Sequence, residues 1–128
     1  HSGEIRVCIE AGLPLSYLWR NADARERAIS MFGKLGVWDT ENNNGVLIYL
    51  LLADHRIEIV ADRGLSSLVD PKQWRKIADE LAIACRAGRF EAGMLDAIST
   101  VDTLLRKNFG LVDGESNPNE LSNLPHIR

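Results

Sequence analysis

Two short polar runs of the sequence hold the residue types that could do chemistry. They are Asp39, Thr40, Glu41 and Asn44 in the first run and Asp62 in the second. Carboxylate, hydroxyl and side-chain amide oxygens are the ligands that hard cations prefer, and Ca²⁺ takes six to eight of them. These residue types therefore point to a cation site, or to a phosphate-ester site in which a metal polarises the phosphate and activates a water.

The same polar runs also have a plainer interpretation. Asp, Asn and Gly are common in turns because they bond to their own backbone and tolerate a positive φ. The spacing Thr40-x-Asn42-x-Asn44-Gly45 partly matches an EF-hand loop, but position twelve is Leu51, where an EF-hand has a bidentate Glu. The loop is therefore not an EF-hand, and a cation site and a set of structural turns both stay open.

Arg63, which follows Asp62, has two interpretations as well. It could bind an anion or an acidic group of a partner, or it could simply pair with its neighbour. The sequence contains no G-x-S-x-G, P-loop or H-E-x-x-H motif, and no nucleophile–base pair is visible. This favours a binding module over an enzyme, and a metal-assisted phosphatase acting on phosphomonoesters is the alternative.

Three predicted strands must position these runs. Alternation predicts a strand over Glu4–Glu10, with its Ile and Val residues on the face that we expect to be better buried. Residues 46–53 are apolar on both faces, which is typical of a central strand covered on both sides. A polar break at residues 54–55 separates them from an alternating run at 57–61. We therefore expect a hairpin, with the third strand antiparallel to the second.

Capping patterns predict the helices. Asp23 with a Glu three residues later begins a helix that Gly36 ends, and Asp70–Pro71 begins a second helix that Gly88 ends. A third helix is expected over about 90–107. Its predicted inward-facing residues are Leu95, Ile98, Val101 and Leu105.

The predicted order is therefore β-α-β-β-α-α. A β-α-β crossover favours a parallel first pair of strands, and helices on both faces complete an α/β fold, a three-layer α/β/α sandwich. Its sheet is mixed and mostly parallel, with one hairpin. Parallel strands begin at one end of a sheet and the hairpin returns there. We therefore expect Glu4, the 39–44 loop and Asp62 to meet at one edge.

Composition narrows the functional classes. The 128 residues carry a formal charge of −3, which argues against a nucleic-acid partner, and the longest apolar run, 46–53, has eight residues, too few to span a bilayer. Because the chain begins at His1 and not at Met, we expect a leader or anchor to lie outside it. The apolar connection Leu13–Trp19 is expected to cover the sheet edge; exposure to a partner or membrane is the alternative.

Three sequence segments, at residues 1–7, 37–49 and 58–64, match the pattern of a known family in their order and spacing. The helix with Trp74 and the helix start at 90–93 fit the same pattern. Together they resemble the TPM domain, which is found in bacterial membrane-associated proteins, in a thylakoid-lumen photosystem repair factor and in a receptor-accessory protein of animals.

The resemblance covers roughly residues 1–109, and we expect the Asn-, Pro- and Ser-rich residues 110–128 to form an extended tail. It implies an α/β sandwich with a mixed sheet. Some relatives bind calcium, some are described as phosphatases, and others resemble accessory factors of membrane complexes. The resemblance thus implies a membrane-associated binding module, with calcium as its cofactor and a protein of a membrane complex as its partner. Phe109-Gly110 stands where relatives often carry Phe-Pro, which affects only the helix exit.

Overall fold

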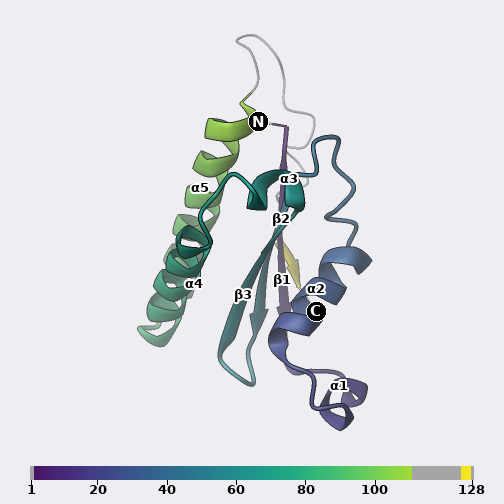
Figure 1. Cartoon of the computed structure of the whole chain (residues 1–128). Coiled ribbons are helices and arrows are strands. Elements are labelled where there is room, and N and C mark those ends of the chain that lie inside the picture. The colour runs from purple at the N-terminus through teal and green to yellow at the C-terminus, as the bar shows by residue number, and fades with distance from the viewer. Residues whose placement is uncertain (1, 111–124, 128) are drawn as a thin grey trace.

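A four-stranded mixed sheet in the order β3-β2-β1-β4 forms the centre of the molecule (Figure 1). The computed structural model describes residues 2–110 and 125–127. β1 is parallel to both β2 and β4, and β2 is antiparallel to β3, so the predicted mixed, mostly parallel sheet with a hairpin is confirmed. The strands are β1 (Glu4–Glu10), β2 (Gly45–Leu51), β3 (Arg56–Ala61) and β4 (Pro125–Ile127).

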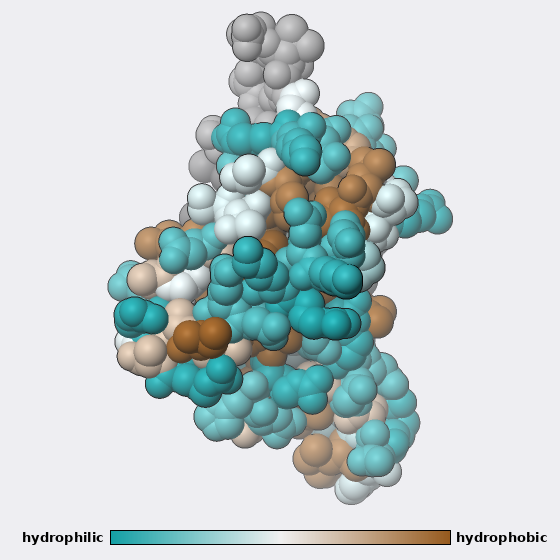
Figure 2. All heavy atoms as spheres, turned by 60° about the vertical axis from the view of Figure 1, so that its left-hand side comes forward, coloured by the Kyte–Doolittle hydropathy of each residue, from teal (hydrophilic) through white to brown (hydrophobic). Residues whose placement is uncertain are grey.

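Helices cover both faces of this sheet, which confirms the predicted three-layer α/β/α sandwich (Figure 1). α4 and α5 pack on one face, and α2 packs on the other. On the side that Figure 2 brings forward, hydrophobic atoms lie in separate patches among hydrophilic ones. The helices are α1 (Leu15–Trp19), α2 (Ala24–Lys34), α3 (Arg63–Ser66), α4 (Pro71–Arg86) and α5 (Phe90–Phe109).

β2 is the strand on which both cores are built. All seven of its residues are buried, as expected for a strand with apolar side chains on both faces. Val46, Ile48 and Leu50 face α4 and α5, whereas Leu47 and Tyr49 face α2. Each large apolar side chain buried in this way contributes about 1.5–3 kcal/mol to folding, so β2 holds the sheet that positions the loops at its ends.

The predicted helix caps are present. The Asp23 carboxylate accepts a hydrogen bond from the Glu26 N–H at 2.9 Å, and the Asp70 carboxylate accepts one from the Lys72 N–H at 2.9 Å. Gly36 and Gly88 follow α2 and α4 with φ values of 70° and 76°. This left-handed conformation favours glycine, so the same residues that predicted the helix ends also form them.

Replacing Asp70 by alanine is expected to lower the free energy of unfolding by about 1 kcal/mol, because the first turn of α4 would lose its side-chain acceptor. Asp70→Asn keeps the acceptor and should stay close to the wild type. Urea unfolding measures both variants. The exposed Glu80→Ala is the control inside the same helix. Equal losses for Asp70→Ala and Asp70→Asn would contradict a capping role.

Several expectations about apolar residues are wrong. Leu15, Leu18 and Trp19 are 59%, 58% and 80% exposed, so the connection that contains them forms the projecting helix α1 and does not cover the sheet edge (Figure 1). Leu95, predicted to face inward, is 64% exposed, and its neighbour Met94 is buried in its place. Helical spacing locates an apolar stripe only to within one residue where several apolar residues are adjacent.

The structure contains short helices and a strand that the sequence did not indicate. α1, α3 and β4 were not predicted, because each is five residues long or shorter and has no periodic pattern of its own. Most of the predicted tail, residues 111–124, lies outside the described residues, so the division at residue 110 stays a prediction. Within residues 2–110 and 125–127, no helix combines the length and the apolar character needed to cross a bilayer.

Candidate functional site

The two polar runs lie side by side at one end of the sheet. β1 and β2 start together there, with Glu4 opposite Gly45, and β3 finishes beside them. Two backbone hydrogen bonds then join the runs: the Asp62 N–H donates to the Gly45 carbonyl at 2.9 Å, and the Gly64 N–H donates to the Asn43 carbonyl at 2.8 Å. The hairpin return therefore brings the loop over 39–44 against the start of α3.

Gly64 is needed for this close approach. A Cβ atom built on Gly64 would lie 2.2 Å from the backbone oxygen of Asn42 and 2.6 Å from that of Asn43. Both distances are far inside van der Waals contact, and both neighbours are backbone atoms. The first turn of α3 can rest on the 39–44 loop only because residue 64 has no side chain.

Two of the predicted site residues act as turn and cap residues. The Thr40 hydroxyl accepts a hydrogen bond from the Asn44 N–H at 2.9 Å, and the Asp62 carboxylate accepts one from the Arg63 N–H at 2.7 Å as the N-cap of α3. Asp39 and Glu41 are exposed on the same loop, and so is the Arg63 side chain at the start of α3. Every predicted site residue thus lies at this end of the sheet, and the bonds of Thr40 and Asp62 are typical of turns and helix caps.

Asn44 differs from its neighbours in the loop. It is fully buried, and its Nδ2 donates to the Ser2 hydroxyl at 3.2 Å. Its Oδ1 is buried and has no hydrogen-bond partner among the described residues. An unsatisfied buried acceptor typically costs about 1–3 kcal/mol, and most buried polar groups in proteins do have a partner. Asn44 Oδ1 is therefore a buried oxygen of this loop whose bonding the described residues do not account for.

The donor set at this edge is rich in oxygen but poor in clustered carboxylates. Within the described ranges, no three or more His, Cys, Asp or Glu side chains are grouped so that they could hold a metal. A cation here would be bound mainly by amide, hydroxyl and carbonyl oxygens with single carboxylates, a mixture that Ca²⁺ accepts. This arrangement does not suit a cation such as Zn²⁺, which prefers four Cys, His or carboxylate ligands.

A buried charge cluster lies at the opposite end of β1, and sequence reasoning missed it. Arg27 of α2 binds the Glu10 carboxylate through two hydrogen bonds of 2.7 and 2.8 Å, and the Tyr49 hydroxyl donates to the same carboxylate at 2.7 Å. Arg27 and Glu10 are only 6% and 7% exposed. One signal was present in the sequence: Arg27 lies at helical spacing within the apolar stripe of α2.

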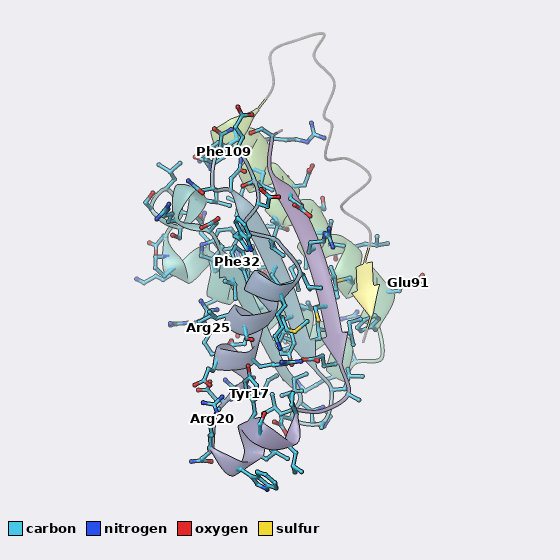
Figure 3. The ribbon with its side chains drawn as sticks, turned by 90° about the vertical axis from the view of Figure 1, so that its right-hand side faces the viewer. Tyr17, Arg20, Arg25, Phe32, Glu91 and Phe109 are labelled. Atoms are coloured by element: carbon cyan, nitrogen blue, oxygen red, sulfur yellow. The ribbon has the colours of Figure 1, made fainter. Side chains whose placement is uncertain are left out.

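The cluster perturbs its members in the directions that its geometry requires. The hydrogen bond from Arg27 to Glu10 raises the pKa of the guanidinium, and burial, followed by the bond to Glu10, raises the pKa of Tyr49. The Tyr17 ring lies under two cations, with Arg20 at 5.0 Å and Arg27 at 5.2 Å from its centroid. Figure 3 shows Tyr17 and Arg20 where α1 meets α2. The cluster therefore fixes α1 and α2 to β1, away from the candidate cation site.

Comparison with known proteins places this geometry in a family. Among solved structures, the BA42 protein of the psychrophilic bacterium Bizionia argentinensis is similar to this chain with a TM-score of 0.81 and 28% identity, over 99% of this chain and 81% of that one. The N-terminal domain of a protein from P. gingivalis has a TM-score of 0.67 and 22% identity, over 91% of this chain and 71% of that one. At this identity the second likeness shows the fold alone.

No curated protein matches the chain. The sequence model described as the TPM domain matches residues 1–104. This range holds β1, β2 and β3, the loop over 39–44, α3, α4 and most of α5. Because the match extends over far more than half of the sequence, the chain belongs to the TPM domain family.

Proposed function

We propose that this domain is a binding module that serves a membrane-associated complex and carries a Ca²⁺ site at the loop over 39–44. The observation that supports the cation site best is the fully buried Asn44, whose Oδ1 has no partner among the described residues. An amide oxygen of this kind is a typical ligand of a hard cation such as Ca²⁺.

The residues that would hold the cation come from both polar runs. Asn44 Oδ1 is the inner ligand, and Thr40 is already oriented by its bond to the Asn44 N–H. Asp39 and Glu41 would supply negative charge from the exposed side of the loop, and Asp62 would supply it from α3. A bound cation would neutralise charge at this edge and leave Arg63 exposed beside it for an acidic group of a partner.

A binding role suits this donor set better than catalysis. A phosphatase needs a nucleophile or an activated water, together with a base within hydrogen-bond reach. The hydroxyl of Thr40 is engaged by a backbone N–H of its own loop, and His55 lies in the β2–β3 hairpin at the other end of the sheet. A metal-assisted phosphatase acting on phosphomonoesters remains the alternative function, and the experiment below distinguishes the two.

Titration of the ¹⁵N-labelled chain with Ca²⁺, Mg²⁺ and phosphate tests the proposal. We expect Ca²⁺ to produce saturable amide shifts confined to residues 39–45 and 62–64. Asp39→Asn should weaken Ca²⁺ binding about tenfold, which corresponds to about 1.4 kcal/mol, because it removes an exposed negative charge from the loop. Asp54→Asn, which changes an exposed carboxylate in the opposite hairpin, should leave the affinity unchanged.

The same titration, together with an assay of phosphomonoester hydrolysis, defines the outcomes that count against the proposal. An absence of saturable shifts with Ca²⁺ would remove the cation site. Metal-dependent turnover of a phosphomonoester that Asp39→Asn abolishes would assign the phosphatase alternative to this edge. Turnover that survives both Asp39→Asn and Asp62→Ala would place any such activity elsewhere.

A further inference from the structure

β3 is an open edge strand. It lies at the end of the sheet order, opposite β4, and none of the described residues pairs with its outer side. In Figure 1 it lies between α4 on one side and α2 on the other. Edge strands present unpaired N–H and C=O groups that another chain can bind, and proteins usually shield them. The outer side of β3 is therefore the place to look for an interaction surface.

The hydrogen-bond pattern identifies which backbone groups point outward. The Asp62 N–H bonds inward to β2, so residues 56, 58 and 60 bond inward as well, because an antiparallel ladder alternates. Residues 57, 59 and 61 must then direct their N–H and C=O groups outward. One contact agrees with this: Arg25 of α2 donates to the Ile59 carbonyl at 2.6 Å.

A groove of 620 Å³ runs along this edge, and it is lined by Ile57, Ile59 and Ala61, the residues whose backbone groups are directed outward. On the α4 side, Trp74 and Ala78 form an apolar wall. The Trp74 Nε1–H has no acceptor among the described residues. The groove therefore combines outward-directed strand backbone with an apolar wall.

The charge of the groove indicates what it would bind. Arg25, Arg56 and Arg75 line it with the two carboxylates of Glu58 and Asp79, an excess of one positive charge in a chain whose formal charge is −3. Arg56 lies 3.8 Å from Glu58, whereas Arg75 has no ion-pair partner among the described residues. Complementary charge favours an acidic ligand.

We propose that the outer edge of β3 is a docking site for an extended, acidic segment of a partner protein, which pairs with β3 as an added strand. Side chains of an added strand alternate between the two faces. Apolar residues of the segment would lie against Trp74 and Ala78, and acidic residues would face Arg25 and Arg56. This inference deepens the binding-module part of the proposed function and does not depend on the cation site.

Arg25 would take part directly when a segment binds at this edge. In the free domain its guanidinium shields the Ile59 carbonyl (Figure 3 labels Arg25 on α2). An incoming strand would replace it with a backbone N–H of its own. The displaced guanidinium would then bind an acidic side chain of the segment. The residue that shields the edge thus also selects the ligand.

A peptide of alternating glutamate and valine, added to the ¹⁵N-labelled 128-residue chain, is the probe. We expect amide shifts at residues 57–61, slower hydrogen exchange of the Ile57, Ile59 and Ala61 amides, and binding at least tenfold tighter than that of a lysine–valine peptide. An N-methylated version of the glutamate–valine peptide keeps the side chains but cannot form the ladder, so it should not bind. Equal binding of the N-methylated and unmethylated glutamate–valine peptides would overturn strand addition.

The Arg56→Glu and Arg25→Glu variants, both at exposed positions, complete the test. Each should weaken peptide binding at least tenfold without changing the melting temperature by more than a few degrees. Hydrogen exchange of the β3 amides is also measured without peptide at rising concentrations of the domain. Slower exchange at high concentration would assign the edge to a second copy of the chain and overturn the proposal. A failed peptide titration with intact Ca²⁺ shifts at 39–45 would remove this inference and leave the cation site standing.

Discussion

Replacing Arg27 by methionine is expected to lower the free energy of unfolding by about 3–5 kcal/mol, because the Glu10 carboxylate would stay buried without its cation. Arg27 and Glu10 are 6% and 7% exposed and share two hydrogen bonds. Methionine keeps most of the apolar volume of the side chain, so the loss reports mainly the missing charge. Urea unfolding followed by circular dichroism measures it.

Two further variants separate the ion pair from general packing. Arg27→Met combined with Glu10→Gln removes both charges, and we expect the double variant to lose clearly less stability than the sum of the single losses. Tyr49→Phe removes only the hydroxyl bond to Glu10 and should cost about 1.5–3 kcal/mol. Additive losses in the double variant would mean that the two charges do not stabilise each other.

An exposed pair in α5 provides the matched control. Arg106 contacts Asp102 at 2.8 Å, nearly the same distance as in the buried pair, but the Arg106 side chain is 64% exposed. Exposed pairs of this kind contribute about 0.2–1 kcal/mol. Arg106→Met should therefore cost several times less than Arg27→Met, and a similar loss for both would show that burial is not what makes the Glu10 pair important.

The Glu10 cluster also shows where sequence reasoning reached its limit. Alternation assigned Glu10 correctly to the face of β1 opposite Ile5, Val7 and Ile9, but it predicted that face to be less buried. The face is covered by α2, and Glu10 can be enclosed there because Arg27 neutralises its charge and Tyr49 donates a hydrogen bond to it. Periodicity reports which side of a strand a residue is on. It does not report which element packs there, since that depends on contacts distant in sequence.

The candidate site was predictable in its position but not in its contacts. Parallel β1 and β2 and the hairpin return to β3 were enough to bring Asp39 and Asp62 to one edge, because strand direction alone determines which loops meet. The buried state of Asn44 was not predictable, since it depends on how the loop folds over Ser2. Local patterns thus located the loop, and tertiary packing decided which of its oxygens lacks a partner among the described residues.

Replacing Gly64 by alanine is expected to lower the free energy of unfolding by about 3 kcal/mol. This is the upper end of the range of about 1–3 kcal/mol that overpacking usually costs. The new Cβ would meet the backbone oxygens of Asn42 and Asn43 at 2.2 and 2.6 Å, so the loop over 39–44 would have to move away from α3. Urea unfolding measures the loss. A Ca²⁺ titration of the same variant should show weakened binding, because the two polar runs would separate.

Gly33 is the control for this substitution. It lies within α2, and a Cβ added there meets nothing within 4 Å. Gly33→Ala should therefore stabilise the domain by about 0.5–1 kcal/mol through the higher helix propensity of alanine. Opposite signs for the two variants would show that the Gly64 effect comes from contact with the loop. If Gly64→Ala were as stable as the wild type and bound Ca²⁺ equally well, the cation site would not depend on close contact between the loop and α3.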